Sequence, residues 1–294
     1  MKHQPVRKAV FPVAGLGTRF LPLTKSMPKE MLPLVDRPLV QNAIEEAREA
    51  GIEDFIFVTS RGKGVLEDHF DISPELNATL EARGKTAELE IVKQTQIESG
   101  HLFSTRQHKP LGLGHAVWCA KQIVGREPFA ILLPDDVVLS KRGCLAQMIE
   151  VYNEVGGNVV AVVDVPRDQT NRYGILDVSS DDGRIAAIKG LVEKPKPEVA
   201  PSTLSIIGRY ILQPEVFDHL DQKMVGAGGE IQLTDAMAKL IGGAPFHGYR
   251  FEGKRYDCGD KVGFLEANIA FALARADIGE KVRSAIEEVL RSAR

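Results

Sequence analysis

Short apolar runs alternate with helical patterns through the first half of the chain, and this alternation excludes most architectures. We predict strands over residues 8–13, 54–59, 89–93, 129–134 and 158–165. Apolar residues at helical spacing predict helices over residues 39–50, 115–124 and 145–155. Strands that alternate with helices form right-handed βαβ units. The sequence therefore predicts an α/β fold, with a Rossmann-like, mostly parallel (mixed) sheet flanked by helices on both faces.

From Tyr173 onward the pattern changes to short strands and turns. We predict strands over residues 173–178, 184–192, 204–212 and 246–251, with a hairpin turn at Asp182-Gly183. Helices are predicted over residues 214–222 and 230–240, and two more, over 261–276 and 280–292, end the chain. No linker or repeat divides the sequence. We therefore predict one domain over residues 1–294, with an α/β half (1–165), an antiparallel elaboration (166–260) and C-terminal helices (261–294).

The first predicted strand ends in a glycine-containing turn, Ala14-Gly15-Leu16-Gly17-Thr18-Arg19, and Pro28-Lys29-Glu30 follows shortly after it. Glycines let a backbone pass close to a ligand and direct successive N–H groups at anionic oxygens. Arg19 and Lys29 add two cationic side chains, which suit a polyphosphate. Ligands of such sheets bind at the carboxyl ends of the strands, where this turn falls. The turn therefore predicts a site for a nucleoside triphosphate.

Three better-known glycine motifs do not fit this turn. A P-loop needs Gly-x-x-x-x-Gly-Lys-Ser/Thr, which the sequence lacks. A dinucleotide-binding fingerprint needs a third glycine where Phe20 stands, and an acid where the second strand ends in Thr59-Ser60-Arg61. A protein kinase would carry HRD and DFG motifs, and both are absent. A lone Gly-x-Gly also occurs as a tight strand exit, so the phosphate interpretation depends on the residues that accompany it.

Composition excludes several classes of partner. Of the 294 residues, 44% are hydrophobic and 26% are charged, as in an ordinary globular protein. The net charge of −3 gives no reason to expect a nucleic acid or a membrane surface as partner. We find no signal-peptide pattern and no apolar run of the ~18 residues that a membrane span needs. Cys119, Cys144 and Cys258 are widely spaced and odd in number, which argues against disulfides. We therefore expect a cytoplasmic protein.

Distinct sequence blocks follow one another along the chain. They are GLGTRFLP from Gly15, KSMPKEMLPLVDRPLVQ from Lys25, RQHKPLGLGHAV from Arg106, LLPDD from Leu132, NRYGILDV from Asn171, VEKPKP from Val192, APSTLSIIGRYIL from Ala200, GGEIQLTDAM from Gly228 and YDCGDKVGF from Tyr256. In content and order these blocks resemble the sugar nucleotidyltransferases, and within them the bacterial UTP–glucose-1-phosphate uridylyltransferases, or UDP-glucose pyrophosphorylases. The resemblance covers nearly the whole chain, except the first six residues and the last helix.

The resemblance implies a nucleotide site in residues 1–165. It assigns Arg19 and Lys29 to the triphosphate, as catalytic residues. The residues that it assigns to nucleotide binding are Ala14, Gly15, Gly17, Thr18, Glu30, Gln107 and Gly112. Among these, the backbone near Ala14 and Gly15, with Glu30, holds the nucleoside. Gln107 and Gly112 read the base, because an amide can complement the imide edge of uracil.

The resemblance also implies a sugar-phosphate site in residues 166–260. Backbone at Gly174 approaches the sugar, Glu193 binds the sugar hydroxyls and Lys194 binds the sugar phosphate. Without the resemblance, Glu193 and Lys194 would be an ordinary solvated pair in a loop.

Two aspartates, Asp135 and Asp257, are the metal ligands that the family pattern implies. Magnesium takes carboxylate and phosphate oxygens, and Asp135 follows a buried strand beside the glycine turn. Without the family pattern, either residue would be a turn or a helix cap. We interpret Asp136 as a turn residue and Cys258 as a packing residue, since no histidine motif accompanies that thiol.

The implied reaction is transfer of the uridylyl group of UTP to α-D-glucose 1-phosphate, giving UDP-glucose and pyrophosphate with Mg²⁺ as cofactor. The nucleophile is already an anionic phosphate oxygen, so no general base is needed. One alternative keeps the fold but changes the base or the sugar, as in a thymidylyl- or adenylyltransferase. A second alternative is a non-catalytic protein that retains the nucleotide pocket. We also expect a homo-oligomer, a dimer or tetramer, with residues 261–294 as candidate contacts and a role in polysaccharide biosynthesis.

Overall fold

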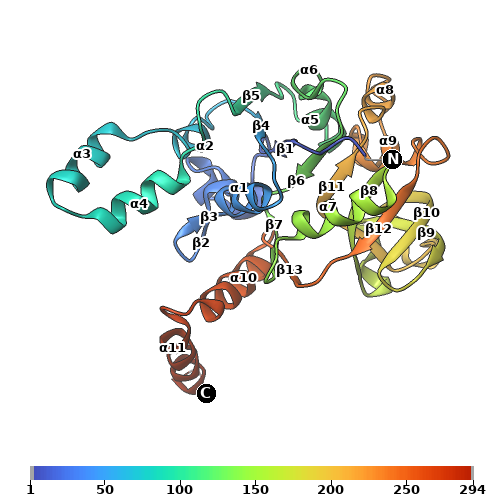
Figure 1. Cartoon of the computed structure of the whole chain (residues 1–294). Helices are drawn as coiled ribbons and strands as arrows, with labels where there is room; N and C mark the ends of the chain where they lie inside the picture. Colours follow the sequence, from blue (N-terminus) through green and yellow to red (C-terminus); the bar gives the residue numbers. More distant parts are fainter. Residues whose placement is uncertain (1–2, 293–294) are drawn as a thin grey trace.

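Residues 3–292 are described by a computed structural model whose centre is a nine-stranded sheet of order β5-β4-β1-β6-β11-β8-β12-β10-β9 (Figure 1). Its strands are β1 (Lys8–Pro12), β4 (Asp54–Thr59), β5 (Leu102–Arg106), β6 (Phe129–Leu132), β8 (Asn158–Asp164), β9 (Gly174–Asp181), β10 (Ile185–Glu193), β11 (Leu204–Leu212) and β12 (Phe246–Arg250). Strands β5, β4, β1 and β6 are parallel, as are β8 and β12, whereas β11 and β10 run antiparallel to both neighbours. The predicted mixed α/β sheet, with an antiparallel elaboration, is confirmed.

Helices cover both faces of this sheet. One face packs against α5 (Leu113–Cys119), α6 (Lys121–Val124), α8 (Val216–Leu220) and α9 (Leu233–Ala238), and the other against α1 (Leu39–Glu49), α2 (Val65–Asp68) and α7 (Cys144–Val155). In β1, Val10 belongs to the first apolar cluster, and Ala9 and Phe11 belong to the second. Successive side chains of a strand point to opposite faces, so the consecutive apolar residues Ala9 to Phe11 of β1 are buried on both.

A separate two-stranded sheet joins distant parts of the chain. Strand β7 (Asp136–Leu139) pairs antiparallel with β13 (Lys254–Asp257), and Asp136 lies opposite Asp257. Helix α10 (Lys261–Ala274) packs against this pair, and α11 (Gly279–Ser292) extends away from the body beyond it (Figure 1). Strands β2 (Pro33–Leu34) and β3 (Arg37–Pro38) form a short hairpin. In this hairpin β2 contacts α10, and β3 contacts α1. Short 3₁₀ turns cover Thr18–Phe20, Leu23–Lys25, Lys29–Met31, Arg167–Arg172, Pro197–Val199 and Ala227–Gly229.

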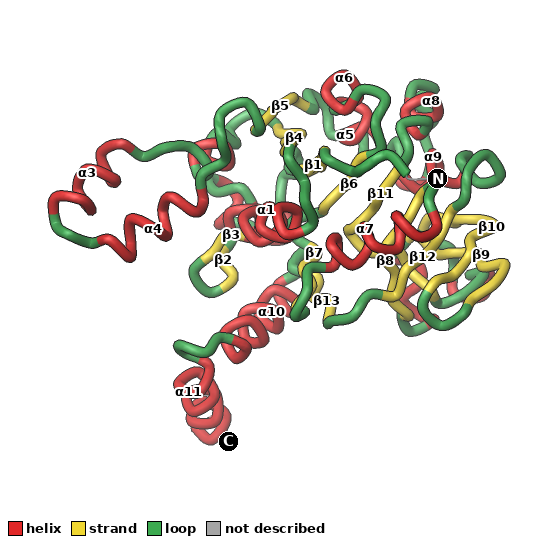
Figure 2. The backbone as a smooth tube through the Cα atoms, viewed as in Figure 1, coloured by secondary structure: helices red, strands yellow, loops and turns green. Residues whose placement is uncertain are grey.

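The strand predicted over residues 89–93 is wrong. These residues lie in α4 (Thr86–Thr95), which forms with α3 (Pro74–Ala82) a helical pair that projects from the body (Figure 2). Leu89 is buried but Ile91 is 64% exposed, so the apolar run fills no sheet position. The edge strand is instead β5, whose residues are only partly buried or exposed. Its mixed composition concealed it, because an edge strand with little burial needs no apolar run.

Most other elements differ from the predictions only at their ends. The hairpin at Asp182-Gly183 is confirmed, with Gly183 at φ 89° between β9 and β10. The single helix predicted over residues 115–124 is divided at Ala120 into α5 and α6. Within residues 3–292, no helix combines the length and apolar character required to span a membrane.

Candidate active site

The glycine turn leaves the carboxyl end of β1 and folds back over Lys29. Gly17 has φ 63°, and a Cβ there would lie 3.1 Å from Cβ of Lys29 and 3.1 Å from Cγ2 of Thr24. Both the left-handed backbone and the close contact favour glycine at this position. The Thr24 hydroxyl donates to the Gly17 carbonyl oxygen at 2.7 Å and holds the turn closed. The side chain of Lys29 therefore runs along the inside of the turn.

Glu30 lies beneath the turn. It is 0% exposed, and its Oε2 is 2.9 Å from Nζ of Lys63, which also donates to the Val13 carbonyl oxygen. Burial raises the pKa of Glu30, although the ammonium groups of Lys63 and Lys29 oppose this shift. Among the described residues, Oε1 of Glu30 has no hydrogen-bond partner. This geometry ties the turn to the core and does not bring Glu30 to a cavity wall.

Two adjoining cavities hold most of the candidate residues. The first, about 230 Å³, is lined by Ala14, Gly15, Gln107 and Gly112, and we call it the nucleotide cavity after the ligand that the resemblance implies. The second, about 290 Å³, is lined by Asp135, Gly174, Glu193, Lys194 and Asp257, and we call it the sugar cavity for the same reason. Leu113 and Glu230 line both cavities, so the two share a wall. The structure therefore brings nine of the candidate residues to two adjacent cavities.

The base end of the nucleotide cavity forms where two distant segments meet backbone to backbone. Gly112 has φ 102°, and a Cβ there would lie 2.7 Å from Cβ of Glu230 and 2.8 Å from the Ile231 carbonyl oxygen. The Ile231 N–H donates to the Leu111 carbonyl oxygen at 2.7 Å. Gln107 Nε2 lies 3.0 Å from the Gly112 carbonyl oxygen and 3.0 Å from Nδ1 of His115. The amide of Gln107 is thus held in place at the cavity wall.

The carboxylates of Asp135 and Asp257 converge although they come from opposite ends of the chain. The β7–β13 pairing brings them together, and the Cys258 N–H donates to the Asp135 carbonyl oxygen at 2.7 Å. A Cβ on Gly259 would lie 2.8 Å from Oδ1 of Asp257 and 3.2 Å from Oδ2 of Asp135. Both oxygens therefore border one small space that a single methyl group would fill. Two carboxylate oxygens placed in this way suit a hard divalent cation, and NH1 of Arg19 lies 3.4 Å from the same point.

Cations also border this space. Asp135 Oδ2 is 2.5 Å from Nζ of Lys29, and NH1 of Arg19 donates to the Gly259 carbonyl oxygen at 3.2 Å. Burial tends to raise the pKa of Asp135, but the Lys29 ammonium and Arg19 outweigh it and lower the pKa. The pKa of Asp257 is raised by burial, against the opposing effect of Arg255. Asp135 is thus paired closely with Lys29, whereas Asp257 has, among the described residues, only two longer ion pairs, its Oδ2 lying 3.8 Å from NH2 of Arg172 and 3.8 Å from NH2 of Arg255.

Asp136 is more than a turn residue, so that interpretation is wrong. It is 7% exposed and begins β7. Its Oδ1 is 2.6 Å from Nε of Arg255, its Oδ2 is 3.1 Å from NH2 of Arg255, and the Gly208 N–H donates to Oδ2 at 2.9 Å. Arg255 also reaches the Tyr173 hydroxyl at 3.3 Å. Asp136 therefore anchors Arg255 at the back of the sugar cavity.

The sugar end is built on the β9–β10 hairpin, where Gly174 lies opposite Glu193. A Cβ on Gly174 would lie 3.0 Å from Oγ1 of Thr234 and 3.3 Å from Oε2 of Glu193, so a side chain here would crowd this wall of the cavity. Lys194 has φ 48°, an uncommon value for a residue with a side chain, and its Nζ is 3.4 Å from Oε1 of Glu193. Backbone strain of this kind persists where the surroundings enforce it, often at functional sites.

Cys258 packs as expected. It is 1% exposed within an apolar cluster that includes Leu32 and Leu34, and burial raises the pKa of its thiol well above the ordinary value. Thr18 and Arg19 are exposed on the turn. The sequence interpretation missed Lys63, Arg172, Glu230, Thr234 and Arg255. Arg172, Glu230 and Thr234 lie within the sequence blocks quoted above, and Arg255 directly precedes the block that contains Asp257, so only Lys63 carried no signal.

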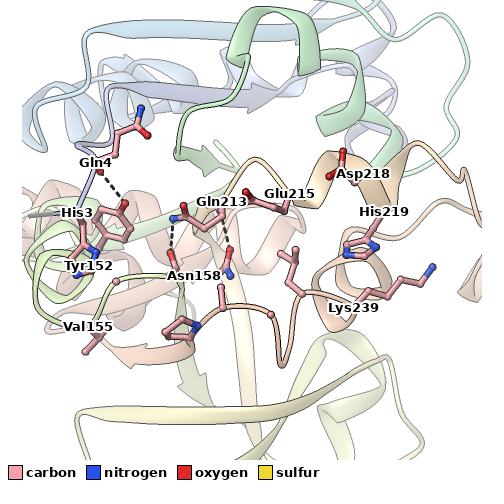
Figure 3. A pocket seen from close by; sticks show the side chains of 16 residues that line it. His3, Gln4, Tyr152, Val155, Asn158, Gln213, Glu215, Asp218, His219 and Lys239 are labelled. Carbon is pink, nitrogen blue, oxygen red and sulfur yellow. Dashed lines mark hydrogen bonds between the residues drawn. The ribbon is translucent and has the colours of Figure 1, made fainter. Parts of the chain in front are cut away.

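A larger cavity, about 660 Å³, lies elsewhere, where strands β8 and β12 begin (Figure 3). Tyr152, Asn158, Gln213 and Lys239 are among its lining residues, and none of the candidate residues belongs to it. Its walls are tied by a hydrogen bond from the Gln213 N–H to Oδ1 of Asn158 at 2.9 Å. Ligands of parallel sheets bind at the opposite, carboxyl ends of strands, so the smaller cavities are the candidate site.

Known proteins share both the sequence and this architecture. A family model described as Nucleotidyl transferase matches residues 8–272. A UTP--glucose-1-phosphate uridylyltransferase of Komagataeibacter xylinus is 61% identical over 88% of this chain and 91% of its own length. The UTP-bound UGPase of Acinetobacter baumannii is 44% identical, with a TM-score of 0.88 over 96% of this chain and 99% of that one. A UDP-glucose pyrophosphorylase complexed with UDP-glucose is 40% identical, with a TM-score of 0.82 over 92% of this chain and 100% of that one.

The family match spans β1, both cavities and the converging aspartates, and the relatives share nearly the whole architecture. On sequence and on structure, the chain belongs to the nucleotidyl transferase family.

Proposed function

We propose that this protein transfers the uridylyl group of UTP to α-D-glucose 1-phosphate, giving UDP-glucose and pyrophosphate. The observation that carries the proposal is the pair of adjoining cavities, with Lys29 and the two carboxylates between the glycine turn and the sugar cavity. Relatives named for this reaction include a UTP-bound structure and one complexed with UDP-glucose. A nucleotide and a sugar phosphate in these cavities would meet at the shared wall.

The nucleotide binds over the glycine turn in this proposal. Ala14 and Gly15 lie against the nucleoside, and Gln107 with Gly112 reads the base. Gly17 and Thr18 present backbone and hydroxyl groups to the phosphates, and Arg19 with Lys29 binds the triphosphate. Glu30 acts indirectly, because it is buried and paired with Lys63. It holds the turn in the shape that the nucleoside requires.

The sugar phosphate binds in the second cavity. Gly174 allows close approach of the sugar, Glu193 accepts hydrogen bonds from its hydroxyls and Lys194 binds its phosphate. Lys194 is weakly held at 3.4 Å from Glu193, so its ammonium can turn to a phosphate.

Catalysis follows from alignment and charge. The attacking oxygen of the sugar phosphate is already anionic, so the protein needs no general base. Holding both polyanions for in-line attack removes much of the entropic barrier, and Arg19 and Lys29 balance the charge on the α-phosphate and the leaving pyrophosphate. This assignment is consistent with the absence of a histidine among the residues that line the sugar cavity.

Nucleotidyltransferases of this kind generally use a divalent metal ion, and we propose Mg²⁺ here. Asp135 and Asp257 would hold it, and when bound it would neutralise phosphate charge between the two substrates. In the described structure the Lys29 ammonium pairs with Asp135 and balances the charge of that carboxylate. When substrate binds, the ammonium moves from Asp135 to a phosphate group of the substrate.

We further propose a homo-oligomer, a dimer or tetramer, formed through the C-terminal helices. On α10, Val262 and Leu265 are 67% and 61% exposed, and on α11, Val289 and Leu290 are 64% and 61% exposed. Apolar side chains on a projecting helix pair favour burial against another subunit. Light scattering after gel filtration tests this, since a monomeric mass would contradict it. A cytoplasmic location, where UTP is made, and a role in polysaccharide biosynthesis complete the proposal.

A pyrophosphate-release assay across the four ribonucleoside triphosphates, dTTP and several sugar 1-phosphates tests the function. We expect UTP with glucose 1-phosphate to give the highest kcat/KM, because Gln107 and Gly112 frame a site for a pyrimidine. Comparable kcat/KM with ATP would favour an adenylyltransferase, and a clear preference for dTTP a thymidylyltransferase. Nucleotide binding without pyrophosphate release would favour the non-catalytic alternative.

A further inference from the structure

The amide of Gln107 is held from two sides by groups of this chain. Its Nε2 lies 3.0 Å from the Gly112 carbonyl oxygen and 3.0 Å from Nδ1 of His115. A primary amide carries two N–H donors, and these two acceptors use both of them. Among residues 3–292, no hydrogen bond reaches Oε1 of Gln107, and this side chain lines the nucleotide cavity. The oxygen alone is left to meet a base.

The two acceptors differ in how firmly they fix the amide. The Gly112 carbonyl oxygen can only accept, whatever the pH. The imidazole of His115 can accept at Nδ1 only when it is neutral and carries its proton on Nε2. A protonated ring would direct an N–H at the amide N–H groups and repel them. The orientation of Gln107 therefore depends on the state of one histidine.

We propose, building on the uridylyl transfer proposed above, that His115 is a positioning residue whose unprotonated Nδ1 holds the Gln107 oxygen toward the base, so that the site selects bases with an imide N–H. Uracil carries this N–H donor at the ring position where cytosine has a bare nitrogen acceptor. The held oxygen accepts from the first base and repels the second. Thymine carries the same N–H, so His115 does not separate it from uracil.

The surroundings of His115 favour the neutral ring. Burial lowers the pKa of His115, and the Lys223 ammonium lowers it further. The Trp118 ring stacks on it with centroids 5.6 Å apart, and Sγ of Cys119 is 3.9 Å from Nδ1. Other charged or titratable groups nearby are Asp221, which accepts from Nε1 of Trp118 at 2.7 Å, Glu230 beyond Gly112, and Arg106 and His108 beside Gln107. The ring is therefore neutral at pH 7 and becomes charged only below the ordinary histidine value of about 6.5.

Two substitutions separate an acceptor role from a packing role. In His115→Asn the side-chain oxygen can stand near the place of Nδ1 and cannot titrate. In His115→Leu no acceptor remains. The measurement is kcat/KM for UTP and for CTP, each with saturating glucose 1-phosphate, from about pH 5.5 to 8, a range that brackets the histidine value. Both nucleotides carry the same triphosphate, so its ionisation cancels in the UTP-to-CTP ratio.

We expect His115→Leu to lower the UTP-to-CTP ratio about 2- to 10-fold, the scale of one lost hydrogen bond. His115→Asn should keep a ratio near wild type. On acidification below about pH 6.5 the wild-type ratio should fall, while that of His115→Asn stays flat. If His115 only packs, its replacement would change kcat/KM for UTP and for CTP by the same factor, and the UTP-to-CTP ratio would stay the same.

An unchanged ratio in His115→Leu, in an enzyme that still prefers UTP, would overturn the role of His115 and leave the proposed function intact. A wild-type enzyme with no preference for UTP over CTP would overturn the proposed base specificity itself. If His115→Leu does not fold, the pH profile of His115→Asn decides. A ratio that falls with acid as in wild type would overturn the proposal.

Discussion

Two charge clusters meet the segment from Leu133 to Asp136, one at Leu133 and the other at Asp135. They differ in how completely their charges are paired. Arg209 is 1% exposed and meets Glu46 through two contacts of 2.8 and 2.9 Å, while its NH1 donates to the Leu133 and Gly208 carbonyl oxygens at 3.0 Å. In the other cluster, Asp135 and Asp257 have side chains 23% and 28% exposed. Within the described part of the chain, Lys29 contacts only Asp135, and Asp257 has only the longer 3.8 Å ion pairs with Arg172 and Arg255. The matched cluster supports the fold, and the incompletely matched one is able to bind.

The largest effect should come from removing charge at the incompletely matched cluster. We expect Asp135→Asn and Asp257→Asn each to lower kcat about 10³- to 10⁴-fold, because each removes half of the charge that fixes the cation. Thermal stability should stay near wild type. If both residues hold one ion, the double variant should be scarcely worse than either single variant, since residues that act as a unit are strongly non-additive.

The control for this experiment is Asp260→Asn. Asp260 caps α10 by accepting from the Val262 and Gly263 N–H groups, and asparagine caps a helix equally well. This variant should therefore retain most activity. A fully active Asp257→Asn enzyme, or losses that multiply in the double variant, would refute the shared ion. Asp136→Asn is unsuitable as a control because Asp136 is buried against Arg255.

The matched cluster should show the opposite behaviour. We expect Glu46→Ala to lower the free energy of unfolding by about 3–5 kcal/mol, because it leaves the buried Arg209 guanidinium unpaired. Turnover per folded molecule should change little. Urea unfolding and an active-site titration separate the two quantities. The matched control is Glu45→Ala, whose exposed pair with Arg37 should contribute at most about 1 kcal/mol. Equal destabilisation by both substitutions would remove the distinction between the clusters.

A smaller effect should follow loss of the weakly paired cation at the sugar cavity. We expect Lys194→Ala to lower kcat/KM for glucose 1-phosphate by about 10- to 150-fold, equivalent to about 1.5–3 kcal/mol, with UTP binding little changed. Steady-state kinetics with each substrate varied in turn provides the measurement. Lys196→Ala, on the same loop but outside the cavity lining, should behave as wild type. An equal loss of UTP affinity would show that Lys194 does not act specifically on the sugar phosphate.

The smallest effect concerns the backbone of the same residue. Lys194 has φ 48°, so glycine at this position should relieve strain that alanine retains. We expect Lys194→Gly to be about 1 kcal/mol more stable than Lys194→Ala, with the same loss of sugar-phosphate use. Parallel thermal melts and kinetics test this. Equal stability of the glycine and alanine variants would mean that a side chain at this position adds no backbone strain.

Elements with a strong local pattern were predictable from the sequence. Strands β4 and β11 have the predicted bounds, because each is a mostly apolar segment buried on both faces. The run over residues 89–93 was misread because a short apolar stretch fits a strand and a helix equally well. Strands β7 and β13 have no local signal, since their pairing is set by contacts between residues as far apart as Asp136 and Arg255, 119 positions away.

The same division applies to the site. The resemblance supplied Gln107, Gly112, Asp135, Gly174, Glu193, Lys194 and Asp257, which all line one of the two cavities. It could not supply Lys63, which lies in an ordinary loop and becomes important only through its contact with Glu30. Likewise, the reason for a glycine at 112 is the Ile231 backbone, and no local pattern reveals that neighbour. Contacts across long sequence separations are therefore the part that sequence reasoning missed.

The pairing of β7 with β13 has a consequence for synthesis on the ribosome. The strands β1, β4, β5 and β6 and the glycine turn are complete by Leu132, but Asp257 belongs to β13, the last strand among the described residues. A nascent chain can therefore form part of its nucleotide cavity long before Asp257, the second of the two proposed metal ligands, has been added. If Asp257 holds the metal as proposed, an incompletely translated chain is unable to consume UTP.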